Sequence, residues 1–225
     1  MKKYALTFVR LFIGLFLYAV GIVFTINANL GLSPWDTFHQ GISKHTGITM
    51  GQASIIIGLI IVAIDWAAGE KVGIGTIFNM LFIGIFMDLL MLNHLIPSYD
   101  NIAARIIMML LGMLIIGIAC YFYIGAGLGS GPRDGLMVAL AKKTNKPVKL
   151  IRSCIEAVPL IIGYLLGGSV GFGTVIMVVF GGYFIQFAFK MLKFDVRDVE
   201  HQFIDDYIKV IKEALSNKKE ETNIN

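Results

Sequence analysis

Charged side chains are scarce in this chain. They make up 15% of its 225 residues, whereas 56% of the residues are hydrophobic. A soluble domain of this size carries about 25% charged residues, and so few charges cannot cover a surface that faces water. An ordinary soluble globular protein is therefore excluded. Several apolar stretches instead approach the ~20 residues that a membrane-spanning helix needs. The sequence predicts an all-α polytopic membrane helical bundle.

Cysteine is scarce as well. The two cysteines, Cys120 and Cys154, lie inside apolar segments and make neither a disulfide framework nor a zinc site. We interpret both as small buried hydrophobes.

His39 and His45 are too few ligands for a metal site. We expect no metal and no cofactor. The spans contain no HExxH, GxSxG or paired catalytic cluster, which indicates that the protein is not an enzyme.

The net charge of +4 does not indicate nucleic-acid binding. Lysine and arginine cluster at the ends of apolar stretches, where they set the orientation of a membrane protein. At the N-terminus two lysines precede a long apolar run that has no clean cleavage site after it. We therefore expect an uncleaved first span rather than a removed signal peptide.

Two motifs with glycine, proline and aspartate interrupt the apolar chain. "NLGLSPWDTFH" at 29–39 and "GLGSGPRDGLM" at 127–137 begin 98 residues apart. With the same offset and no gap, "VGIGT" at 72–76 falls on "VGFGT" at 170–174. Apolar composition alone does not place proline, aspartate and several glycines in register. The sequence therefore predicts an internal duplication.

Each repeat contains three long apolar segments and one short segment. In repeat one, about 5–92, and repeat two, about 103–192, we expect spans at about 4–27, 52–68, 74–92, 103–125, 151–166 and 172–192. The short segments, 34–44 and 132–143, reach only ~16–18 Å as helices, about half the hydrocarbon thickness. We expect each of them to form a half-helix or an interfacial helix.

Three full spans per repeat force the second repeat to enter the membrane from the opposite side. This gives two inverted repeats of three spans plus one short half-helix each. With both termini in the cytoplasm the outer side keeps only Lys44 and Arg105, and the inner side collects the following residues: Lys2, Lys3, Arg10, Lys71, Arg133, Lys142, Lys143, Lys146, Lys149, Arg152, Lys190 and Lys193. The alternative is eight spans in parallel repeats, in which the short helices cross fully. Helix length and charge bias favour six spans.

The first motif has the features of a helix start. Ser33 is a good N-cap, and Pro34 suits the first helical position. Asp36 faces the positive end of the helix and completes a capping-box-like pattern. In the second motif Gly131 takes the cap position. We therefore expect each motif to end a long helix and begin a short one.

Two interpretations of these corners stay open. In the first, the aspartates only satisfy backbone N–H groups of their own helices. In the second, the corners line a central site, because half-helix N-termini in transporters point at anionic groups of substrates. The candidate substrate-binding residues are then Ser33, Trp35, Asp36, Arg133 and Asp134. We expect an anion or zwitterion beside Arg133 and an apolar or aromatic group beside Trp35.

Acidic residues within apolar spans are functional candidates by default. Asp88 and Glu156 are the candidate proton-coupling residues. Asp88 lies near the outer end of its span, where a paired or snorkelling acid is equally expected. Glu156 follows Arg152 by four residues on the same helix face, and a structural ion pair is the favoured interpretation there.

The tail, residues 193–225, lies outside the membrane domain, 1–192. One helical stripe contains Val196, Val199, Phe203, Tyr207, Ile211 and Ala214. We expect a cytoplasmic amphipathic helix and then a disordered end, "SNKKEETNIN".

The stretches "GLSPWDTFHQGISKHTG", "GIGTIFNMLFIGIFMD" and "GPRDGLMVALAKKT" resemble the YczE/YyaS/YitT family of bacterial integral membrane proteins, and within it the YczE-like branch. The resemblance covers about residues 5–192. It implies a multi-span protein of the bacterial plasma membrane, and it implies no activity and no catalytic residue.

From the residues themselves we predict a small-molecule secondary transporter or exporter. The alternative is a non-transporting membrane scaffold or regulatory protein with the tail as its handle. The expected partners are the lipid bilayer and an unidentified small molecule. Six short spans per chain also fit a homodimer.

Overall fold

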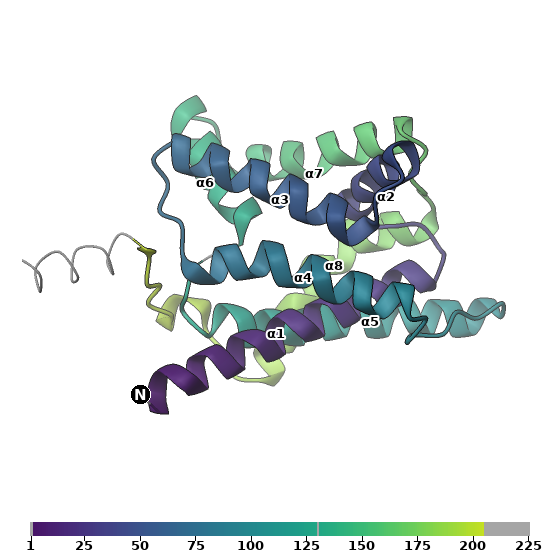
Figure 1. Ribbon diagram of the computed structural model, residues 1–225, viewed down its shortest axis with the longest axis horizontal. Helices are drawn as coiled ribbons and strands as arrows, with labels where there is room; N and C mark the ends of the chain where they lie inside the picture. The colour runs from purple at the N-terminus through teal and green to yellow at the C-terminus, as the bar shows by residue number, and fades with distance from the viewer. Residues whose placement is uncertain (1, 130, 205–225) are drawn as a thin grey trace, which may run out of the picture.

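The computed structural model describes residues 2–129 and 131–204. This part of the chain contains eight α-helices, one 3₁₀ turn and no strand (Figure 1). The elements are α1 (Lys2–Asn27), α2 (Pro34–Thr46), α3 (Met50–Ala67), α4 (Ile74–Leu92), α5 (Ile102–Ile124), α6 (Pro132–Thr144), α7 (Val148–Leu165), α8 (Phe172–Met191) and η1 (Val196–Asp198). The predicted all-α class is confirmed.

Five of these helices, α1, α3, α4, α5 and α8, are long and apolar enough to cross a membrane. α7 has the same length as α3 but carries Lys149, Arg152 and Glu156, and it is not among the five. The two 13-residue helices lie at opposite ends of the long axis of the molecule, α2 at one end and α6 at the other (Figure 1).

The bounds of the second four helices nearly repeat those of the first four with a shift of 98 residues. α2 begins at Pro34 and α6 at Pro132, and both have 13 residues. α3 begins at Met50 and α7 at Val148, and both have 18 residues. Helix order and helix length thus follow the spacing of the sequence motifs.

In each half of the chain, the start of the last helix forms a backbone hydrogen bond with a loop of the other half. The backbone N–H of Gly173 donates a hydrogen bond to the carbonyl oxygen of Leu30, and that of Gly75 donates to Leu128, both at 2.7 Å. A Cβ atom on Gly73 would lie 2.2 Å from the Leu128 oxygen, so this approach requires glycine. The glycine-rich starts of α4 and α8 are therefore packing elements.

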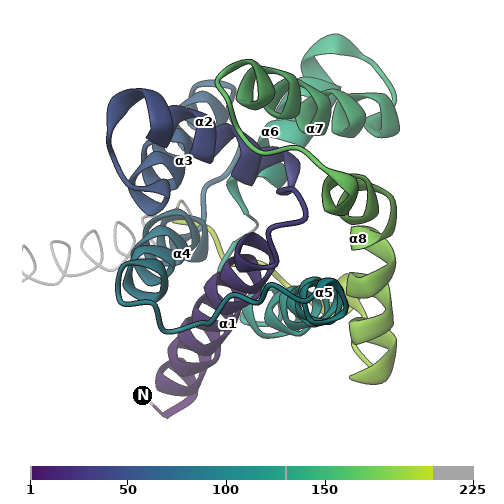
Figure 2. The ribbon, with the colours of Figure 1, turned by 90° about the vertical axis from the view of Figure 1, so that its right-hand side faces the viewer.

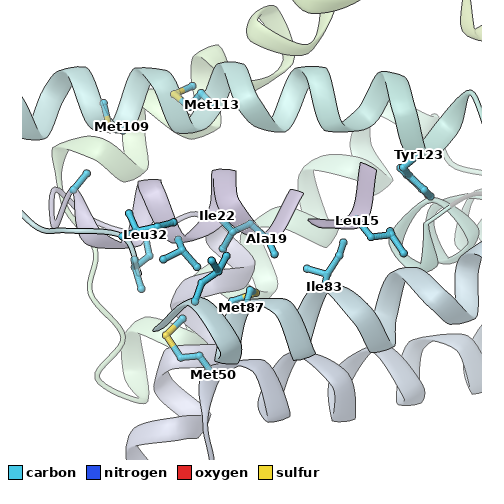
Figure 3. Packing of buried hydrophobic residues seen from close by; sticks show 14 of the residues in the cluster. Leu15, Ala19, Ile22, Leu32, Met50, Ile83, Met87, Met109, Met113 and Tyr123 are labelled. Carbon is cyan, nitrogen blue, oxygen red and sulfur yellow. The ribbon is translucent and has the colours of Figure 1, made fainter. Parts of the chain in front are cut away.

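The core lies where α1 packs between α4 and α5. Leu15 and Ala19 of α1, Met87 of α4 and Met113 of α5 belong to one buried hydrophobic cluster (Figure 3). In lipid, close van der Waals packing holds such helices together rather than the hydrophobic effect. The core thus joins α1 and α5, which form the most extensive helix contact of the bundle.

The two short helices lie between α3 and α7. Seen along the long axis, α3 and α4 lie on one side and α7 and α8 on the other (Figure 2). α2 packs against α7, and α6 packs against α3, so each short helix contacts a helix from the other half. This crossed packing brings the starts of α2 and α6 into the interior.

The two halves differ in the packing of their last two helices. α3 lies tightly along α4, where a Cβ atom on Gly51 would lie 2.1 Å from the carbonyl oxygen of Gly84. In contrast, α7 makes almost no contact with α8. Around Gly181 and Gly182 of α8 no atom lies within 4 Å of the position of an added Cβ. The last two helices of the first half are thus closely packed, whereas those of the second half are not.

The described part of the tail passes through η1 and returns to the helical bundle. The backbone N–H of Gln202 donates a hydrogen bond to the carbonyl oxygen of Gly127 at 2.8 Å. Residues 199–203 are not helical, so the predicted amphipathic helix does not form there. Residues 205–225, which complete the predicted stripe, lie outside the described residues.

Candidate functional site

α2 begins as its sequence predicts. The Ser33 hydroxyl accepts a hydrogen bond from the Asp36 backbone N–H at 3.3 Å and donates one to Asp36 Oδ2 at 2.5 Å. Pro34 occupies the first helical position, where its missing N–H costs nothing. Asp36 is only 5% exposed. Its carboxylate is therefore held by the start of its own helix.

α6 begins with the same pattern but in a more open setting. Gly131 is the N-cap and provides no side-chain cap, and Pro132 follows it. Asp134 occupies the position that corresponds to Asp36, yet Asp134 is exposed whereas Asp36 is buried. The two corners share a backbone pattern and differ in their access to solvent.

The starts of the two short helices meet. The Cζ atom of Arg133 lies 4.4 Å from the centre of the Trp35 ring. This is within the ~6 Å at which a guanidinium and an aromatic face attract each other. Within 2–129 and 131–204, the guanidinium makes no hydrogen bond or ion pair. The N–H donors of Arg133 are thus available to a ligand.

A cavity of about 340 Å³ surrounds this contact and is lined by residues of all eight helices. Four of the five predicted substrate-binding residues line it. The fifth, Ser33, is not part of the lining and donates a hydrogen bond to the carboxylate of Asp36. The four are Trp35, Asp36, Arg133 and Asp134. The volume lies in the range typical of small-molecule sites, about 300–1,000 Å³.

Two further hydrogen-bond donors lie at the cavity wall. Trp35 Nε1 and the Tyr123 hydroxyl are buried and have no hydrogen-bond partner in the described part of the chain. Buried polar groups of folded proteins are nearly always bonded to protein or to water. Trp35 of α2 and Tyr123 of α5 thus line the same cavity as Arg133 of α6, each with a hydrogen-bond donor that has no partner among the described residues. The arrangement suits a ligand that carries hydrogen-bond acceptors.

α7 contributes two charged residues to the wall, Arg152 and Glu156. From the sequence we favoured a structural ion pair between Arg152 and Glu156. The described residues form no such ion pair. Both charges face the cavity instead. Glu156 is therefore a carboxyl group within the site that is not bound to its neighbour on the helix.

Asp88, the other acidic candidate, is not among the residues that line the cavity. Its carboxylate accepts hydrogen bonds from the Thr49 hydroxyl at 2.5 Å and from the Gly51 backbone N–H at 2.9 Å. These bonds tie α4 to the first turn of α3. The geometry gives Asp88 a role in helix packing.

Sequence reasoning missed Tyr18 and Tyr123, which line the cavity from α1 and α5. Tyrosine in an apolar span is easily taken for a membrane-interface anchor. Tyr18 lies well inside α1, and this position was the available signal, whereas Tyr123 is the last residue but one of α5, where an interface anchor is the ordinary expectation. His39 was considered only as a metal ligand, and it too lines the cavity. No group of three or more potential metal ligands occurs in the described residues.

Apolar spans that enclose two converging helix starts and a charged cavity define a polytopic integral membrane protein. The chain belongs to the family described as "Family of unknown function (DUF6198)", which matches residues 5–190. It is 39% identical over 181 residues to "Uncharacterized membrane protein YczE" of Bacillus subtilis (strain 168), which covers 79% of this chain and 82% of the relative.

Two further relatives are similar over most of their length. An "Uncharacterized protein" of Haemophilus influenzae (strain ATCC 51907 / DSM 11121 / KW20 / Rd) is 29% identical over 182 residues, 81% of this chain and 83% of the relative. "Uncharacterized protein YyaS" of Bacillus subtilis (strain 168) is 27% identical over 174 residues, 76% of this chain and 86% of the relative. No solved structure matches the chain. The predicted family resemblance is confirmed.

Proposed function

We propose that the protein is a small-molecule secondary transporter. The observation that carries the proposal is the contact of Arg133 with Trp35 inside a charged cavity. Interrupted helices at membrane depth are tolerated where they line a cavity, and transporters place their substrate sites between such half-helices. A scaffold has no need for buried donors that lack partners.

We also propose that the two halves are inverted repeats with six spans. The reciprocal hydrogen bonds, Gly173 to Leu30 and Gly75 to Leu128, support a pseudo-twofold relation between the halves. α2 and α6 reach roughly 20 Å at 1.5 Å per residue, too short to cross. α7 becomes the sixth span, and its charges are accommodated because Arg152 and Glu156 face the cavity.

The distribution of lysine and arginine supports a plasma-membrane protein with both termini in the cytoplasm. In this orientation Asp134, the exposed aspartate, lies on the cytoplasmic side of the cavity, and the buried Asp36 lies on the outer side. We propose that this difference reflects a conformation whose cavity is more accessible from the cytoplasm than from outside.

Each candidate residue then has a distinct role. Arg133 and Trp35 bind the substrate, and Asp134 lines the path from the cytoplasm. The Ser33 hydroxyl holds the carboxylate of Asp36, which is the counterpart of Asp134 on the outer side of the cavity. Glu156 carries the coupling proton, because its carboxyl group faces the cavity and Asp88 is engaged in packing.

Proteoliposomes that enclose a pH-sensitive dye test the proposal. A panel of small anions and zwitterions is added outside, and proton-coupled uptake appears as a compound-dependent change of the inner pH. We expect the signal to be lost in Arg133→Ala and kept in Lys143→Ala, a matched control because Lys143 is exposed at the far end of α6.

The same assay decides against the scaffold alternative, which the docked tail supports through the bond from Gln202 to Gly127. A scaffold gives no signal with any compound. In cells its phenotype disappears when residues 195–225 are deleted and survives Arg133→Ala. That combination of results overturns the transporter.

A further inference from the structure

One wall of the cavity is not sealed by helix packing. Ile155 and Glu156 of α7 and Ile185 and Phe189 of α8 all line the cavity, yet α7 and α8 barely touch. In the first half the corresponding helices, α3 and α4, are in close contact. Between α7 and α8 the cavity wall therefore has an opening in the helix packing that the first half lacks.

This opening is apolar. Val178, Ile185 and Phe189 are spaced by seven and four residues, so they share one face of α8. Val178 is 52% exposed, and the space beside Gly182 is empty of protein atoms. An apolar chain that reaches from the cavity into the lipid meets only apolar groups of α8 along this face.

The inner end of the same space is polar and rich in donors. Arg133, Trp35 Nε1 and the Tyr123 hydroxyl have no hydrogen-bond partner among the residues that the structure describes, and the Arg133 guanidinium only stacks on the Trp35 ring. The Ser33 hydroxyl already binds the carboxylate of Asp36.

Besides Arg133, the charged side chains that line the cavity are three acids, Asp36, Asp134 and Glu156, and one base, Arg152. The Ser33 hydroxyl and the start of α2 hold Asp36, and Asp134 lies at the positive end of α6. An anionic head group is therefore expected beside the two arginines of this wall and away from its three acids.

We propose that the ligand is a single-chain amphiphile with an anionic head group. The head binds between Arg133, Trp35 and Tyr123, and the chain leaves the cavity between α7 and α8. This inference rests on the proposed function, because it names the substrate class of the same cavity. A carboxylate and a phosphate share the required chemistry, and the experiment compares the two.

Trp35 provides the probe. The chain has two tryptophans, and Trp66 is 76% exposed at the end of α3, so Trp66→Phe leaves Trp35 as the only tryptophan, which can be excited selectively over tyrosine. In nanodiscs, 5-doxyl-stearate carries its quencher near the head group and 16-doxyl-stearate near the chain end. We expect saturable quenching of Trp35 by the first and weak quenching by the second.

Competition defines the ligand class. Decanoate and decyl phosphate should both relieve the quenching, and the more effective one identifies the head group. Propionate at a hundredfold higher concentration should not relieve it, and neither should decyltrimethylammonium. Arg133→Gln should weaken 5-doxyl-stearate binding about tenfold, the loss of one charge-assisted hydrogen bond.

Two neighbouring valines test the route of the chain. Val178 and Val179 are both 52% exposed, and their side chains point about 100° apart around α8. Val178→Phe fills the opening and should weaken binding about tenfold, whereas Val179→Phe should leave binding unchanged. Equal effects of the two substitutions overturn the route between α7 and α8.

Failure of this inference differs from failure of the proposed function. If propionate competes as well as decanoate, the amphiphile is overturned and a site for soluble anions remains. If decyltrimethylammonium competes best, the anionic head is overturned. If decanoate binds at Trp35 but proteoliposomes show no flux of any compound, the transporter is overturned and the amphiphile site stands.

Discussion

Trp35 and Arg133 occupy the same position in the two halves of the chain, and they stack on each other at 4.4 Å. In the proposed duplication each of the two residues is the counterpart of the other, and the proposed axis that relates the halves would pass through their contact. Because one is an aromatic ring and the other a cation, the two sides of the central cavity differ in chemistry. A single asymmetric site results rather than two equal ones.

Substitutions of this pair should separate charge from stacking. Arg133→Lys keeps a charge but loses the planar face, and we expect a several-fold loss of substrate affinity. Trp35→Phe weakens the cation–π contact by about 0.5–1 kcal/mol, equivalent to about two- to fivefold in affinity. Binding and flux measurements on purified protein check both. Wild-type affinity in Arg133→Gln contradicts a role for the guanidinium.

The sequence predicted the corners well because their signals are local. Ser33 and Pro34 define a helix start wherever they occur together, and the offset of 98 residues predicted a second start at Pro132. The contact between Trp35 and Arg133 was beyond local reasoning, because it depends on the crossed packing of α2 with α7 and of α6 with α3.

Residues that depend on the environment of a helix face were harder to predict. Arg152 and Glu156 are correctly spaced for an ion pair, but the cavity beside α7 accommodates both charges separately. Asp88 has the sequence context of a functional acid, and its partners, Thr49 and Gly51, come from another helix. The periodicity of a helical sequence shows which residues share a face of the helix, but it does not show which residues of other helices pack against that face.

The six-span arrangement makes a prediction about sidedness. His45 at the end of α2 and Lys143 at the end of α6 are exposed and are 98 residues apart. In a Cys154→Ser background, in which Cys120 is buried, His45→Cys and Lys143→Cys should react with an impermeant thiol reagent from opposite sides of the membrane. Labelling from the same side indicates eight spans and parallel repeats.

The two acidic candidates should behave differently. Asp88→Asn weakens the bonds to Thr49 and Gly51, so we expect lower stability by about 1–3 kcal/mol with transport retained in the protein that folds. Glu156→Gln should keep stability and lose proton-coupled flux, while substrate exchange persists. Flux that survives Glu156→Gln and disappears in folded Asp88→Asn reverses these roles.

Close packing at the crossed loops can be tested with glycines. Gly73→Ala places a methyl group 2.2 Å from the Leu128 oxygen, and we expect a loss of about 1–3 kcal/mol in unfolding free energy. Gly181→Ala is the control, because nothing lies within 4 Å of its added Cβ. Thermal unfolding in detergent compares the two. Equal stability of both variants contradicts the close approach.

The docked tail should respond to pH through His201. Burial lowers the pKa of His201 below its ordinary 6.5, and the charge of Asp134 acts in the opposite direction. A histidine held neutral in the folded state contributes stability that is present above pH 6.5 and is lost as the pH falls toward the lowered pKa. The contact between Gln202 and Gly127 should therefore loosen below pH 6.5.

Amide exchange at Gln202 measures this loosening. The wild type is compared with His201→Gln at each pH, so that the intrinsic dependence of exchange on pH cancels. Because glutamine does not titrate, the ratio of the two rates should rise as the pH falls from 7.5 to 5.5. A ratio that stays constant means that protonation of His201 has no part in holding the tail, and the tail then depends only on its backbone bonds to the bundle.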